Sequence, residues 1–130
     1  MNPRIAQRLL WIDGLAGATA GAAMLLARPW LIGWYRLPGD LLLLIGLANL
    51  AYGAFSLSLA SRARRPRPLL LLLILANLTW AVFCLRWAFI HSHSASPLGM
   101  LQLVGEALFV GGLASLEWRW RERLLSAEPA

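Results

Sequence analysis

Charged residues are scarce in this chain, and lysine is absent altogether. Only 14% of the 130 residues are charged, whereas a soluble domain has about 25%. The chain is 59% hydrophobic, with a mean hydropathy of +0.63, which excludes an ordinary soluble domain. The net charge of +6 is carried by arginines. These arginines fall at the ends of apolar runs, so we expect them to meet anionic lipid headgroups and not nucleic acid.

Cysteine is nearly absent as well, since Cys84 is the single one. One cysteine excludes an intramolecular disulfide and a Cys-x-x-Cys pair, and with them the quinone-linked enzymes that work through cysteine pairs. Cys84 falls inside an apolar run, where it is expected to be a small packing residue. His91 and His93 have no third ligand nearby, so no metal site and no other cofactor is expected.

Long apolar runs are what the sequence has in abundance. Residues 41–60 and 69–90 flank a loop with four arginines and two prolines. Each run is about 20 residues long, which lets a helix cross a hydrocarbon core of about 30 Å. A further apolar run lies on either side. We therefore predict an all-α integral membrane four-helix bundle that forms a single domain, with spans at about 9–27, 39–60, 69–90 and 98–118.

Arginine placement predicts how the bundle is oriented. With four spans, the two termini and the loop 61–68 share one side of the membrane. Of the twelve arginines, Arg28, Arg36 and Arg86 fall on the other side, so nine lie with the termini. Because arginine concentrates on the cytoplasmic side, we predict cytoplasmic termini in a bacterial inner membrane, with anionic headgroups as partners on that side.

Two short segments are expected to lie in the membrane interface. Pro29 and Pro38 bound residues 28–38, and we predict that Pro29 ends the first helix there. Residues 117–125 alternate tryptophan with arginine, which is typical of a headgroup anchor, and Glu117 stands one turn before Arg121 as a helix-supporting pair. The anchoring side chains of this second segment are Trp118, Arg119, Trp120, Arg121 and Arg123.

Two patterns concern helix packing. Gly17 and Gly21 form G-x-x-x-G in the first span, a spacing that lets two helix backbones approach closely, either within the chain or between two copies. Residues 47–57 and 75–85 both begin Leu-Ala-Asn-Leu, and both have an aromatic residue at the sixth place, Phe at the ninth and Leu at the eleventh. Neighbouring spans are antiparallel, so this similarity indicates either an inverted repeat or the chance likeness of leucine-rich helices.

Polar residues inside the spans are the candidate site. Glu106 lies twelve residues from the inner end of its span, or about 18 Å at the rise of a helix. Asn49, Asn77, Tyr52 and Gln102 fall within a few turns of that depth, and we expect one polar layer near the midplane.

Asp13 is expected at a depth of only about 7 Å from the inner face of the membrane. This depth is too shallow for Asp13 to pair with Glu106. We expect it to pair with an inner-edge arginine, for which the candidates are Arg8, Arg62 and Arg119.

Three functions remain open from the sequence. The first is a non-catalytic helix-packing module that meets itself or a membrane partner through the Gly17 and Gly21 face. The second is an oligomeric small-molecule or ion transporter that uses Glu106 with Asn49 and Asn77, because an ionisable residue in a span is costly to keep there. The third, an enzyme on lipids, has little support, since no nucleophile–base pair is visible. The sequence slightly favours the first, with Glu106 as hydrogen-bonded glue.

Overall fold

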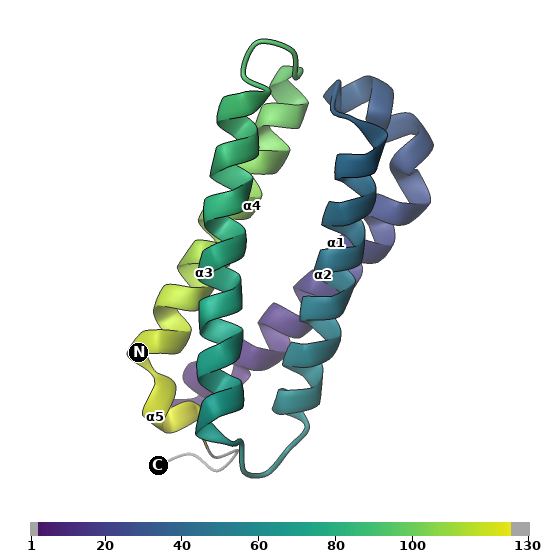
Figure 1. Ribbon diagram of the computed structural model, residues 1–130. Coiled ribbons are helices and arrows are strands. Elements are labelled where there is room, and N and C mark those ends of the chain that lie inside the picture. The colour runs from purple at the N-terminus through teal and green to yellow at the C-terminus, as the bar shows by residue number, and fades with distance from the viewer. Residues whose placement is uncertain (1–2, 126–130) are drawn as a thin grey trace.

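The computed structural model describes residues 3–125, and their side chains from residue 8 onward. Within this range the chain is helical and contains no strand, which confirms the all-α four-helix bundle (Figure 1). The helices are α1 (Pro3–Tyr35), α2 (Gly39–Ala60), α3 (Arg67–Ile90), α4 (Pro97–Arg119) and the short α5 (Arg121–Leu124).

The helix starts follow from local sequence chemistry. Pro38 and Pro66 immediately precede α2 and α3, and Pro97 opens α4, where a missing N–H costs no helical hydrogen bond. Ser96 caps α4, because its hydroxyl accepts from the Gly99 N–H at 3.1 Å. Each long apolar run therefore begins at a defined residue.

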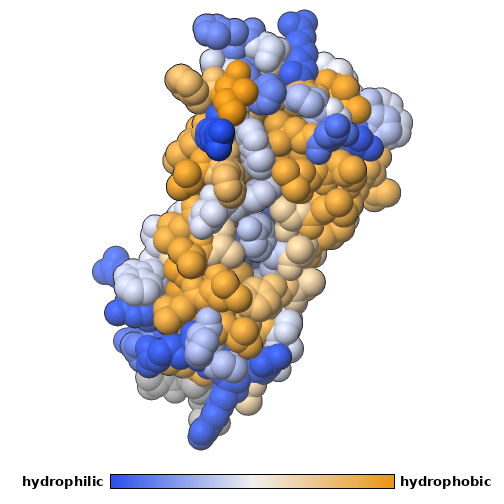
Figure 2. All heavy atoms as spheres, viewed as in Figure 1, coloured by the Kyte–Doolittle hydropathy of each residue, from blue (hydrophilic) through white to orange (hydrophobic). Residues whose placement is uncertain are grey.

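The surface has the polarity of a membrane protein. Four helices are long and apolar enough to cross a membrane, and large side chains such as Leu26 and Phe89 are about four-fifths exposed. Figure 2 shows hydrophobic residues around the middle of the molecule and hydrophilic ones at both ends, with a paler band over the gap between α2 and α3. The chain is thus a small multi-pass membrane protein.

The four long helices associate as two hairpins. α1 packs along the length of α2, and α3 packs along α4, whereas α2 and α3 touch sparsely. α1 also contacts α4, and a space remains between the two hairpins. The position of this space determines where a site can form.

The close helix approach expected at Gly17 and Gly21 occurs within the chain. A Cβ at Gly21 would lie 2.7 Å from the Gly46 carbonyl oxygen, and one at Gly17 would lie 3.0 Å from that of Asn49. Both positions face α2 so tightly that only hydrogen fits without a shift. These glycines are therefore used to form the first hairpin.

The predicted break at Pro29 is wrong. α1 continues through Pro29 to Tyr35 and bends over in its last turns (Figure 1). Proline removes one helical hydrogen bond, but a membrane helix tolerates this loss when its neighbours hold the chain. The helix ends instead at Tyr35, because the next residue, Arg36, has a left-handed φ of 51°. The Tyr35 carbonyl then accepts from the Ser96 N–H at 2.9 Å.

The second predicted interfacial segment is divided between α4 and α5. The Arg121 guanidinium lies 4.0 Å from the Trp118 ring centre, and that of Arg123 lies 4.8 Å from Trp120. Arg119 also lies near the Trp120 ring. These contacts leave the headgroup role of the segment a prediction.

The expected pairing of Glu117 with Arg121 is not found in the described part of the chain. Glu117 is fully buried, while Arg121 donates to the Trp118 carbonyl at 2.8 Å.

The loop between α2 and α3 contains one buried arginine. The Arg65 side chain donates to the carbonyls of Leu59, Ala60 and Leu124 at 2.9–3.0 Å. Its main-chain N–H donates to Leu125 at 2.8 Å. Burial lowers the pKa of the Arg65 guanidinium. Arg65 therefore joins the end of α2 to the end of the chain's helical part.

Candidate functional site

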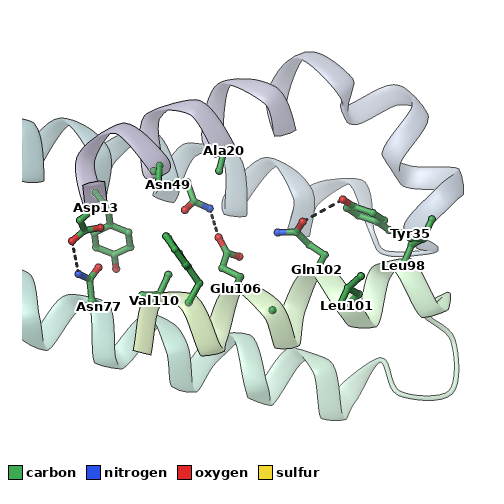
Figure 3. Close-up of a pocket in the computed structure, with 15 residues that line it drawn as sticks. Asp13, Ala20, Tyr35, Asn49, Asn77, Leu98, Leu101, Gln102, Glu106 and Val110 are labelled. Carbon is green, nitrogen blue, oxygen red and sulfur yellow. Dashed lines mark hydrogen bonds between the residues drawn. The ribbon is translucent and has the colours of Figure 1, made fainter. Parts of the chain in front are cut away.

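A cavity of about 380 Å³ lies between the two hairpins, and all four long helices line it. Its volume falls within the range of small-molecule sites. α1 contributes mainly small residues, whereas the polar groups come from every helix, as Figure 3 shows. The polar side chains in the wall are Asp13, Tyr35, Asn49, Tyr52, Asn77, Gln102 and Glu106.

Glu106 is at the centre of this wall. Asn49 Nδ2 donates to Glu106 Oε1 and also to the Ile45 carbonyl at 2.9 Å. The buried Cys84 thiol donates to Glu106 Oε2 at 3.6 Å. The carboxyl group is therefore held by neutral donors from α2 and α3, which belong to different hairpins. The predicted association of Asn49 with Glu106 is present.

Aromatic side chains surround the same carboxyl group. The Trp80 indole and the Gln102 amide also turn toward Glu106. Trp80 is only 5% exposed, yet its Nε1 has no hydrogen-bond partner among the described residues. The Tyr52 ring meets Trp80 edge-on, with the ring centres 5.9 Å apart. Aromatic and amide side chains from α2, α3 and α4 therefore surround the Glu106 carboxyl group.

Tyr35 is the last residue of this row of polar side chains, toward the α1–α2 connection. Its hydroxyl donates to Gln102 Oε1 at 3.2 Å (Figure 3). A second hollow of about 260 Å³ shares Ala20, Tyr35, Asn49 and Gln102 with the first. Polar groups thus follow the cavity from Tyr35 to Glu106.

Asn77 lies in a different cluster from the one predicted. Its Nδ2 donates to Asp13 Oδ2 at 3.0 Å and to Glu117 Oε1 at 3.1 Å. Asn77 therefore donates to other acids than Glu106, although both residues line one cavity. The reason is that the bundle separates into hairpins, and Asn77 faces the N-terminal half of α1.

Asp13 also has a different partner from the predicted arginine. Within the described side chains, none of Arg8, Arg62 and Arg119 forms an ion pair with it. The arginine ion pair that the described chain contains joins Arg67 to Glu122 at 2.7 Å. Asp13 is only 7% exposed. Its buried carboxyl group therefore accepts a hydrogen bond from the neutral Asn77 amide and not from an arginine.

Glu117 is the site residue that the sequence analysis missed. It stands next to the tryptophan–arginine tail, which suggested an interfacial position. The helical period indicates a buried position instead. Glu117 follows Glu106 by eleven residues, which is about three helical turns. Glu117 therefore faces nearly the same side of α4 as Glu106, toward the bundle.

The repeated segments use their matching residues in similar ways. Asn49 reaches an acid on α4, and Asn77 reaches an acid on α1, so each asparagine crosses between the hairpins. Tyr52 and Trp80, the matching aromatic residues, contact each other. These parallels fit an inverted repeat, which remains a hypothesis.

The cavity is open toward the lipid-facing surface. Leu101 and Phe109 line it and are at least half exposed, and Leu98 beside them is similarly exposed. Across from these α4 residues, α1 presents Ala16 and Ala20. An apolar molecule could therefore enter between α1 and α4 without leaving the bilayer.

Neither family models, nor curated protein sequences, nor solved structures match this chain. Within the described residues, no group of three His, Cys, Asp or Glu side chains could hold a metal ion. The geometry of the cavity is therefore the basis for a functional proposal.

Proposed function

We propose that this protein binds a small amphipathic amine in the cavity between its hairpins, with the ammonium group at Glu106. The observation that carries the proposal is the Glu106 carboxyl group, which lies in an amphipathic cavity and contacts neutral donors from Asn49 and Cys84. A partly buried carboxylate inside a membrane span is costly without a cation, and a cationic ligand would remove that cost.

The shape of the cavity supports a ligand with one polar end. Small residues of α1 and apolar residues of α4 would contact the hydrocarbon part. The opening beside Leu101 and Phe109 faces the region that lipid occupies. A hydrophobic amine partitions into bilayers and could approach by this route. Midplane sites of this kind are used by transporters, so the wider proposal is transport by an assembly of more than one copy.

The packing-module hypothesis has less support from the geometry. Its interface was to be the face of Gly17 and Gly21, and that face contacts α2 within the chain. A partner would therefore need another surface. We propose binding, with no chemical step, as the primary activity.

Calorimetric titration with phenethylamine and with its neutral counterpart phenethyl alcohol tests the proposal. The purified protein in detergent should bind the amine more tightly than the alcohol. Glu106→Gln should lower amine affinity by at least about tenfold, because hydrogen bonds to charged groups contribute about 1.5–3 kcal/mol. Alcohol affinity should change little.

A matched control is available in Glu122→Gln. Glu122 is an exposed acid that pairs with Arg67 at the inner end of the molecule, away from the cavity. This variant should retain full amine affinity. Equal amine binding by the parent and Glu106→Gln, or no preference for amine over alcohol, would contradict the proposal.

A further inference from the structure

Two carboxyl groups lie together at the inner end of the cavity. Asp13 comes from α1 and Glu117 from α4, and both are buried. The single nitrogen Asn77 Nδ2 donates to one oxygen of each. Because both oxygens accept from this one nitrogen, the two carboxyl groups lie close together. Two negative charges on buried carboxyl groups that share one donor would repel strongly.

A second observation concerns the other oxygen of Glu117. Glu117 is 0% exposed, and its Oε2 has no donor within hydrogen-bond distance among the described residues. A buried carboxylate oxygen without a donor is unfavourable. If the carboxyl group carries a proton, this oxygen becomes a hydroxyl that can donate to Asp13. One proton thus removes both the repulsion and the unsatisfied atom.

We propose that Asp13 and Glu117 share one proton and release it when an amine cation occupies Glu106. The sharing of the proton follows from the cluster of Asp13, Asn77 and Glu117 alone, whereas its release rests on the proposed function. In the release step, the carboxylic O–H bond breaks and the proton passes to water. Both carboxylates then remain, and the cation bound at Glu106 compensates the added negative charge.

The cavity provides the connection between the two sites. Asp13 and Asn77 line the same space as Glu106. A positive charge in that space favours a second negative charge nearby. The protein would therefore exchange one proton for one cation, which is the stoichiometry of an antiporter.

The other charged groups near the pair do not neutralise it in the described structure. α3 presents the neutral Asn77. Arg8 on α1 is exposed. On the α5 side, Arg121 and Arg123 lie over the rings of Trp118 and Trp120.

Infrared spectroscopy of the carboxylic C=O stretch at neutral pH tests the shared proton without any ligand. The parent in detergent should show the band of one protonated carboxyl group in the cluster. Asp13→Asn and Glu117→Gln should each remove that band, while Glu106→Gln should retain it. Two independent variants keep the test decisive if one of them fails to fold.

Two results would overturn the shared proton. A parent spectrum without a protonated carboxyl band would mean that the pair is a dianion. A band that persists in both Asp13→Asn and Glu117→Gln, and disappears in Glu106→Gln, would assign the proton to Glu106.

Proton release is measured by titrating phenethylamine in two buffers of different ionisation enthalpy. The parent should release close to one proton per amine bound, and Glu117→Gln should bind the amine with no release. Binding without release by the parent, or unchanged release in Glu117→Gln, would refute the exchange. A failure of the amine to bind would refute the proposed function and the exchange, but the infrared result would still decide whether the proton is shared.

Discussion

The Arg65 side chain donates to three main-chain carbonyls, two from α2 and one from α5. The carbonyls at a helix end have no partner within the helix, so a guanidinium there supplies the missing donors and favours the negative end of the helix dipole. We predict that Arg65→Gln lowers the free energy of unfolding by about 2 kcal/mol, since buried charged hydrogen bonds contribute about 1.5–3 kcal/mol. Thermal unfolding in detergent measures this loss.

The neighbouring Arg64 is the control for that prediction. It belongs to the same loop and is exposed. Arg64→Gln changes the charge of the loop equally but removes no buried contact, so its unfolding should match the parent's within about 0.5 kcal/mol. Equal destabilisation by the two variants would show that loop charge, and not carbonyl capping, stabilises this end.

The polar residues of the site show what the sequence could predict at this scale. Polar groups in an apolar span are easy to recognise, so Glu106, Asn49 and Gln102 could be found from the sequence. Their partners depend on helix rotation and on which helices meet. For that reason the acids to which Asn77 donates could not be predicted. Glu117 was missed because its neighbours in sequence are interfacial, although its helical face points inward.

At the scale of the elements, the packing of α1 against α2 depends on close contact between the two helix backbones. We predict that Gly21→Ala destabilises the protein by about 1–3 kcal/mol, the usual cost of overpacking. A Cβ there would lie 2.7 Å from the Gly46 oxygen and 2.8 Å from the Leu50 nitrogen. Main-chain atoms of a packed helix cannot move aside cheaply. Thermal unfolding of purified protein in detergent again gives the measurement.

Gly112→Ala provides the matched comparison. Gly112 lies within α4, and a Cβ there meets no described atom within 4 Å. Alanine has the higher helix propensity, so this variant should be neutral or slightly more stable. If Gly21→Ala were equally harmless, the approach of α1 to α2 would have to be looser than the structure has it.

The helix boundaries illustrate a different limit of sequence analysis. The starts of α2, α3 and α4 could be predicted, because proline or serine fixes each one locally. The end of α1 could not. Pro29 disfavours a continuing helix by local rules, and the structure continues because later elements hold the segment. Arg28 Nε donates to the Gly39 carbonyl at 3.0 Å, and Ser96 caps the carbonyls at the end of α1.

At the scale of the whole molecule, span lengths predicted the four-helix bundle but not its division into two hairpins. Leucine-rich faces are nearly interchangeable, so composition does not decide which helices pair closely. The decisive contacts are small residues at matched heights, such as Gly17 opposite Gly53. The cavity between the hairpins follows from that pairing, and the lipid-facing opening follows from the sparse contact between them.

The fold allows the orientation of the bundle in the membrane to be predicted and tested. Figure 1 shows the α2–α3 connection at the same end as the start of α1 and as α5, with the α1–α2 and α3–α4 connections at the opposite end. Because arginines concentrate at the first end, we predict that it faces the cytoplasm. Reporter domains fused at either terminus or inserted in 61–68 should be active only as cytoplasmic fusions, and one inserted in 91–97 only as an external fusion.

Replacing Arg62 and Arg64, which are exposed, with glutamine should weaken this preference, while Arg65 is left intact to keep the fold. A parent whose 91–97 reporter is cytoplasmic would reverse the orientation and place Asp13 and Glu117 at the outer end of the cavity.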